Sequence, residues 1–250
     1  MAPTLHLVRH AQGYHNLSIA NHHMHDPLLT SLGEEQCAHL AANFPYHEKV
    51  DLVVASPIKR TIYTALLGFG DVLQKRGLKV IALPELQETS DMPCDTGSTP
   101  EELVKEFAGK PVDLQFVKEG WNCKRGKWAP TPTAIDKRAW DARLWLKARP
   151  EKHIVVVTHG GFVHHFTEDW SGSNKFAGTG WANTEYRSYN FSSNEPEEAH
   201  IVETQESRRR RRGEEKPLDR EEQVNLKRTV SKDWEARGLY QQAQTIQAKV

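Results

Sequence analysis

The sequence predicts an α/β protein: a three-layer α/β/α sandwich built on a mostly parallel, doubly wound sheet. Short apolar runs alternate along the chain with longer segments in which apolar residues recur at helical spacing. The run from His153 to Thr158 is the most apolar of them and is rich in β-branched residues, which is typical of a central parallel strand. Polar residues follow these runs directly, at the edge where open α/β sheets bind ligands.

The first half of the chain supplies three predicted strands and three predicted helices. An apolar run beginning at Leu5 ends in Arg9 and His10, and the capping-box spacing of Ser31 and Glu34 then opens a helix. A proline after the second strand fixes the entry to the next helix, and Thr99 with a following proline opens a short one. The expected strands are 5–8, 51–55 and 78–83, and the expected helices are 31–44, 61–76 and 99–107.

The second half predicts one more helix before the central strand and one strand after it. Ile135, Ala139, Ala142 and Leu146 lie on one face of a helix over about 133–148. Alternating aromatic and polar residues over 185–191 indicate a peripheral strand. Between 109 and 132 the pattern breaks down into Gly, Pro, Trp and basic residues. We interpret this segment either as a lid over an anionic ligand or as a plain surface excursion.

The C-terminal part differs in composition from the rest. We expect one α/β domain over residues 1–205, followed by a basic and charged extension over 206–250 that is helical or partly disordered. The run Arg208–Arg212 opens this extension. Since the formal net charge of the 250-residue chain is +0, we expect no nucleic-acid binding except through this run.

Cysteine usage and hydropathy indicate the compartment. Cys37, Cys94 and Cys123 are an odd number without C-x-x-C spacing, which favours neither a disulfide framework nor a cysteine-based zinc site. No stretch approaches the roughly 18 apolar residues of a membrane span, and the N-terminus has no apolar leader. We expect a cytoplasmic protein without a membrane partner, and entry into the nucleus stays open.

The residues after the strands have the chemistry of phosphate-ester hydrolysis. His10 can attack phosphorus through a neutral ring nitrogen, while Arg9 and Arg60 can hold phosphoryl oxygens with forked N–H donors. His159 adds a third donor if the bound anion keeps it protonated, and Asn16 adds a neutral one. An acid must protonate the leaving oxygen, and the residues alone leave three candidates for it: Glu85, Glu88 and Asp91.

These motifs, in this order, resemble the histidine phosphatase superfamily, the phosphoglycerate-mutase-like proteins. They are Arg9-His10, Ser56-Pro57-x-x-Arg60, the 84–88 segment and Thr158-His159-Gly160, within a resemblance that covers about residues 4–191. The resemblance implies that Glu88 is the acid and that His10 forms a phosphohistidine that water hydrolyses. It implies the catalytic set His10, Glu88, His159, Arg9 and Arg60, substrate contacts from Arg9, Asn16, Arg60, His159 and Gly160, a small phosphorylated substrate, and neither metal nor cofactor.

Departures from the family pattern bear on which of the family's activities the protein has. Ala11 stands where the family has glycine, and its methyl group could crowd the approach of phosphate. The 89–98 segment lacks the Gly-rich, Trp- and Glu-containing sequence of the mutases, which favours a phosphatase. Gly160 replaces the aspartate of the acid-phosphatase branch. A phosphomutase, a recruited isomerase or dehydratase, and a binding protein on the same scaffold stay open as alternatives.

Two groups of histidines are expected to take no part in catalysis or metal binding. His164 and His165 fall on the helix after His159, where a packing or capping role is more common than catalysis. His22, His23 and His25 lie in a polar loop without a carboxylate at zinc-enzyme spacing, so we expect no metal there.

Overall fold

The computed structural model describes residues 2–173, 180–192 and 198–240. Within these residues seven strands form one sheet in the order β4-β3-β2-β5-β1-β6-β7. The central strand β5 pairs in parallel with β1 on one side and β2 on the other, and β6 runs antiparallel to β1. The strands are β1 Thr4–Arg9, β2 Leu52–Ala55, β3 Val80–Ala82, β4 Val112–Asp113, β5 His153–Thr158, β6 Tyr186–Phe191 and β7 Ile201–Glu203.

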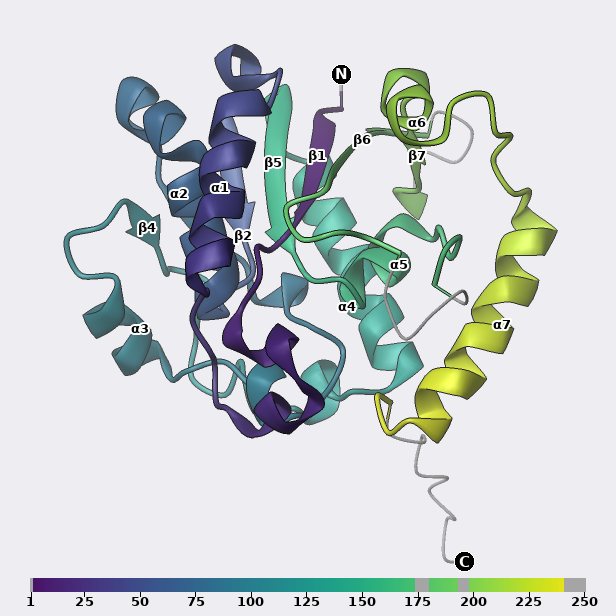
Figure 1. Cartoon of the computed structure of the whole chain (residues 1–250), viewed down its shortest axis with the longest axis horizontal. Coiled ribbons are helices and arrows are strands. Elements are labelled where there is room, and N and C mark those ends of the chain that lie inside the picture. The colour runs from purple at the N-terminus through teal and green to yellow at the C-terminus, as the bar shows by residue number, and fades with distance from the viewer. Residues whose placement is uncertain (1, 174–179, 193–197, 241–250) are drawn as a thin grey trace, which may run out of the picture.

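Helices cover both faces of the sheet, as the α/β/α prediction requires (Figure 1). Side chains of β5 alternate between the faces: Val155 and Val157 pack with the α1 and α2 layer, whereas Ile154 and Val156 pack with the α4 and α5 layer. The predicted fold class is therefore confirmed. The helices are α1 Ser31–Asn43, α2 Lys59–Arg76, α3 Pro100–Glu106, α4 Pro132–Lys147, α5 Phe162–Thr167, α6 Gln205–Arg212 and α7 Arg220–Ala236.

Two helix starts differ from the sequence prediction. Thr30, not Ser31, caps α1, because its hydroxyl accepts the Gly33 N–H at 3.1 Å. Helix α2 begins at Lys59 instead of Thr61, so Arg60 lies in its first turn. The strand-to-helix connection from β2 is thus shorter than expected.

Strands β4 and β7 were not predicted. Each is too short to show a period of two, and β4 lies inside the 109–132 segment that we expected to be irregular. Single-turn 3₁₀ helices complete the ordered connections; among them η4 Pro84–Leu86 and η5 Pro93–Asp95 follow β3, and η1 Tyr14–Leu17 follows β1. These turns lie near the carboxyl ends of the parallel strands, where the predicted site residues gather.

The C-terminal extension folds back onto the domain (Figure 1). Val230 and Trp234 of α7, with Tyr240 beyond it, are buried in the same apolar cluster as α4 and α5. The arginine run forms α6, in which Arg211 binds Glu203 and the guanidinium of Arg210 lies 4.0 Å from the ring centre of Tyr186. Residues 241–250 of the predicted extension lie outside the described residues, and the domain boundary at residue 205 stays a prediction.

Candidate active site

His10 occupies the end of β1, where it is buried and fixed in one orientation. Its Nδ1 lies 2.7 Å from the Ala11 carbonyl oxygen, an acceptor, so Nδ1 carries the proton and donates it. The other ring nitrogen, Nε2, then has a free electron pair and accepts from Arg60 Nε at 3.2 Å. Burial, followed by the charge of Arg60, holds the pKa of His10 well below its usual value. His10 is therefore neutral, with a basic nitrogen facing a cation.

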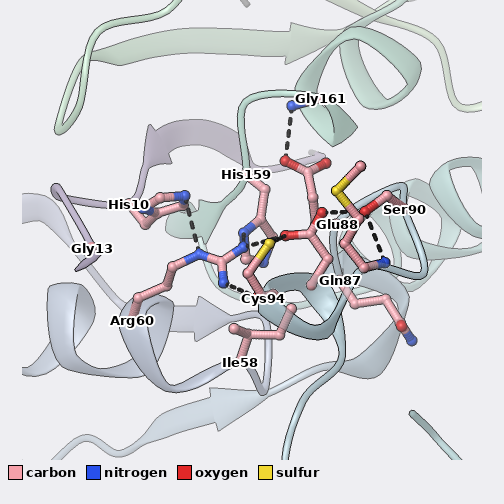
Figure 2. A network of polar contacts seen from close by, with 12 residues as sticks. His10, Gly13, Ile58, Arg60, Gln87, Glu88, Ser90, Cys94, His159 and Gly161 are labelled. Carbon is pink, nitrogen blue, oxygen red and sulfur yellow. Dashed lines mark hydrogen bonds and ion pairs between the residues drawn. The ribbon is translucent and has the colours of Figure 1, made fainter. Parts of the chain in front are cut away.

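Arg60 is the centre of the polar cluster (Figure 2). Its side chain is 1% exposed, and its guanidinium contacts three groups besides His10. Nη1 donates to the Cys94 carbonyl oxygen, while Nη2 donates to Asp95 Oδ1 at 2.9 Å and lies 3.0 Å from His159 Nδ1. Since guanidinium is permanently charged and acts as a rigid planar fork, these contacts fix a positive charge beside the nucleophilic nitrogen.

His159 directly follows the central strand β5, and its ring lies between Arg60 and Ser56. Its Nδ1 faces Arg60, an obligate donor, so the Nε2–H donates to Ser56 Oγ at 2.9 Å. Its ring centre lies 5.2 Å from that of His10. Burial and the charge of Arg60 lower the pKa of His159 well below its usual value. The predicted protonated donor is thus neutral in this structure, and an anion would have to be bound before the ring gains a second proton.

Glu88 lies beyond η4 and meets the amino end of α5. Its carboxylate accepts backbone N–H bonds from Gly161 at 3.0 Å, Phe162 at 2.9 Å and Thr89 at 2.9 Å. Those bonds favour the charged form, yet burial and the neighbouring Asp95 raise the pKa of Glu88 above its usual value. Figure 2 shows the Arg60 guanidinium with His10 on one side and the Glu88 side chain on the other. A raised pKa suits a group that must donate a proton.

The competing carboxylates are engaged elsewhere. Glu85 forms an ion pair with Lys127 of the 109–132 segment, outside the cluster around Arg60. Asp91 is exposed. The backbone around Glu88 is held by Arg138 of α4, whose guanidinium donates to the carbonyl oxygens of Glu85, Gln87 and Glu88. The geometry therefore favours Glu88 among the three.

Arg9 ends β1 beside the charged groups of the cluster and has one donor without a partner among the described residues. One of its terminal nitrogens donates to the Trp181 carbonyl oxygen, but Nε is buried and has no hydrogen-bond partner among the described residues. A buried N–H without a partner costs free energy, which a bound anion would recover. Asn183, which donates to the His10 carbonyl oxygen at 2.9 Å, ties the same loop to the end of β1.

Three predictions about nearby residues have different outcomes. The Ala11 methyl group does not crowd the site, because it is buried with Leu29 and Cys37 and the Ala11 N–H donates to Thr64. Asn16 is exposed, and its Oδ1 accepts the Gly13 N–H at 3.0 Å, so the structure gives it a local role in the turn. Gly160 is buried in the turn after β5, and its neighbour Gly161 makes the contact with Glu88.

Sequence reasoning missed several residues of this cluster. Ser56 and Asp95 contact the catalytic candidates directly, and the Cβ of any residue at position 161 would lie 2.7 Å from Glu88 Oε1, which explains the glycine there. Lys124 is half-buried near Asp95 and Glu88, and burial lowers its pKa to about 8. For Ser56 and Gly161, their places beside motif residues were a usable signal. Lys124 belongs to the basic 109–132 segment, for which a lid over an anionic ligand was one of the two interpretations, and for Asp95 the sequence offered no signal.

The remaining expectations concern other parts of the chain. All three cysteines are free thiols, and burial raises the pKa of Cys94 to about 12. His164 and His165 are buried in α5, where they contact Trp170 and, for His165, Asp136. In the part of the chain that the structure describes, no group of three or more His, Cys, Asp or Glu is arranged to hold a metal ion, and no helix is long and apolar enough to cross a membrane.

Comparison with known proteins gives a consistent picture. Residues 5–204 match the model of the histidine phosphatase superfamily (branch 1). A probable phosphatase of Schizosaccharomyces pombe is 31% identical over 170 residues, covering 65% of this chain and 76% of its own length. A phosphoglycerate mutase-like protein of Arabidopsis thaliana is 28% identical over 200 residues, covering 64% of this chain and 72% of its own.

Solved structures share the fold. The silkworm ecdysone phosphate phosphatase, solved with tungstate, has a TM-score of 0.56 at 14% identity and covers 81% of this chain and 92% of its own. A mycobacterial glucosyl-3-phosphoglycerate phosphatase has a TM-score of 0.50 at 19% identity, covering 81% and 97%. Since the family model spans most of the chain, this protein belongs to the histidine phosphatase superfamily (branch 1).

Proposed function

We propose that the protein is a metal-independent phosphatase that hydrolyses small phosphomonoesters through a phosphohistidine on His10. The observation that carries the proposal is the state of the His10 ring. Its Nδ1–H is bound by the Ala11 carbonyl oxygen, and its Nε2 faces the Arg60 guanidinium. A neutral imidazole nitrogen beside a fixed cation is prepared to attack a phosphoryl group that the cation also binds.

The reaction would proceed in two displacements. In the first, His10 Nε2 forms a bond to phosphorus, the bond from phosphorus to the leaving oxygen breaks, and protonated Glu88 gives that oxygen its proton. In the second, the Glu88 carboxylate takes a proton from water as the water oxygen attacks phosphorus, and the bond to Nε2 breaks. Phosphate is released, and His10 and Glu88 return to their starting states.

The anion-binding groups belong to the chain itself. Arg60 supplies an N–H beside His10 Nε2, and Arg9 supplies a buried N–H that has no partner among the described residues. His159 would add an N–H once a bound phosphoryl group raises the affinity of its Nδ1 for a proton. Since these donors can neutralise the phosphoryl oxygens without an ion, the proposed reaction requires no metal.

The test is phosphate release from a generic aryl phosphate in excess chelator. We expect the parent to release phosphate and His10→Ala to lose roughly a thousandfold or more of kcat, because the nucleophile is removed. His39→Ala, which removes an exposed histidine of α1, is the matched control and should retain full activity. Full activity in His10→Ala would overturn the proposal. Transfer of phosphate between substrate positions in place of release would identify a phosphomutase.

A further inference from the structure

A second carboxylate lies inside the cluster, and the reaction above does not use it. Asp95 ends η5 Pro93–Asp95 and its side chain is 12% exposed. Its Oδ1 accepts from Arg60 Nη2 at 2.9 Å, and its Oδ2 accepts from the Ser90 hydroxyl at 2.6 Å. Both carboxylate oxygens are therefore committed, which holds the group in one orientation between Arg60 and Ser90.

This contact determines how Arg60 faces His10. Asp95 and the Cys94 carbonyl oxygen bind the Nη1 and Nη2 edge of the guanidinium, and Nε is left to face His10 Nε2 at 3.2 Å. Because the guanidinium is planar and rigid, fixing two of its nitrogens fixes the third. Asp95 also balances a charge that would be costly to bury alone.

The same carboxylate acts on Glu88. Among the described residues, six charged or titratable groups besides Asp95 interact with Glu88: Arg60 from α2, Arg9 from β1, Arg138 from α4, Lys124 from the 109–132 segment, the Cys94 thiol from η5 and Tyr240 after α7. The four cations favour ionised Glu88, and so do its backbone N–H bonds. Asp95 opposes them, since two buried carboxylates close together disfavour each other's ionisation.

We propose that Asp95 is a positioning residue of the reaction, whose carboxylate, held by Ser90, orients the Arg60 guanidinium toward His10 Nε2 and places a second negative charge in the buried cluster of Glu88. This inference rests on the proposed function, because it gives Asp95 a part in the reaction of His10 and Glu88. It assigns one side chain to two tasks: orientation of the cation and placement of a second negative charge near the acid.

The first test compares the pH dependence of kcat in the parent and in Asp95→Asn. Removing the charge should move the alkaline limb, where Glu88 loses its proton, by about one pH unit or more toward acid. Above that limb kcat should then fall about tenfold relative to the parent, because one unit changes the protonated fraction tenfold. KM should change less than kcat. An alkaline limb that stays in place would show that Asp95 serves folding alone and would overturn the proposal.

Two matched variants separate charge from shape. Asp95→Glu keeps the carboxylate and should leave the alkaline limb near that of the parent even if kcat falls. Ser90→Ala removes the hydrogen bond to Oδ2 but keeps the charge, so its limb should also stay near that of the parent. A limb displaced as far in these variants as in Asp95→Asn would contradict a role for the charge.

A direct titration makes the inference independent of turnover. The Glu88 carboxyl, followed by ¹³C NMR and assigned with Glu88→Gln, should titrate above the usual glutamate range in the parent and at lower pH in Asp95→Asn. Should the Asn variant not fold, Asp95→Ser removes the same charge. An ordinary titration of Glu88 in the parent would overturn the proposal without any variant. Failure of the parent to release phosphate would count against the proposed function, and this titration would still decide the Asp95 inference.

Discussion

Two buried histidines, His10 at the end of β1 and His165 in α5, occupy clusters of opposite character. In His165 both ring nitrogens are committed to side chains: Nδ1 to Asp136 at 2.7 Å and Nε2 to the Tyr240 hydroxyl at 2.6 Å. In His10 one nitrogen is tied to the backbone and the other meets Arg60. Burial lowers the pKa of both, to about 4 for His165 and well below its usual value for His10.

The comparison shows that burial and a lowered pKa do not by themselves identify a reactive histidine. A reactive histidine is identified by the partner of its Nε2, which is Arg60 for His10 and Tyr240 for His165. Around His165 the neighbours are an acid and a phenol that join α5 to α4 and to the C-terminal extension, and Lys227 of α7 binds the same Asp136. Around His10 the neighbours are cations, one of them with an unused N–H. The contacts of His165 stabilise the packing of α5 against α4 and the C-terminal extension. The surroundings of His10 are suited to bind an anion.

The largest effect outside His10 is expected at Glu88. Glu88→Gln removes the acid and base, so kcat for a phosphate ester with a poor leaving group should fall about 10²- to 10⁴-fold. Because the pKa of Glu88 is raised, the parent should lose activity as pH rises through that pKa, and this alkaline limb should be absent in the variant. Steady-state kinetics across pH measure both. A limb that persists in Glu88→Gln would assign the acid to another group.

A smaller effect is expected at the helix end that holds Glu88. An alanine methyl at position 161 would lie 2.7 Å from Glu88 Oε1, while the backbone there, with φ −75° and ψ −44°, accepts alanine without strain. Displacing the carboxylate should lower kcat by up to about a hundredfold with little loss of stability. Gly70→Ala is the control, since no atom lies within 4 Å of its added methyl group. Equal activity of the two variants would contradict the positioning of Glu88 by this turn.

The smallest effect on catalysis is expected at His165. His165→Gln breaks the contacts with Asp136 and Tyr240 and should lower the free energy of unfolding by about 1–3 kcal/mol, since buried polar partners lose their hydrogen bonds. The value of kcat should stay near that of the parent. Denaturant unfolding and phosphate release measure the two quantities. A loss of kcat comparable to that of Glu88→Gln would erase the distinction between the two histidine clusters.

The sequence was sufficient for the strands that position the site and insufficient for the contacts between their loops. Val155 and its neighbours form a long β-branched run, which predicted the central strand. The site residues Arg9, His10, Arg60 and His159 all lie within a few residues of strand ends. Because the strands are parallel, these ends meet at one edge of the sheet, so the sequence predicted that the four residues lie close together. Nothing in the 89–98 segment has a period, and its fold depends on which groups it meets. Asp95 therefore could not be placed before Arg60 was seen beside it.

The C-terminal extension shows the same limit in another form. The extension was expected to be helical or partly disordered, and its part from Arg220 to Ala236 is the helix α7. Which surface it covers depends on Trp170, His165 and Tyr240, residues far apart in the sequence whose rings pack together. Helical periodicity describes one face of an element and does not name its partner. The arginine run was equally ambiguous, because its ion pair with Glu203 is visible only in the folded chain.

The most direct measurement of the central claim is detection of a phosphoryl group on His10. Glu88→Gln, mixed with an aryl phosphate whose leaving group needs no proton, should form the phosphoenzyme and be slow to hydrolyse it. After denaturation in alkali, mass spectrometry of the peptide that contains His10 should show one acid-labile phosphoryl group, absent when His10→Ala is added. A phosphoryl group on any other residue, or phosphate release by the parent with no phosphoenzyme detectable in either protein, would contradict the account.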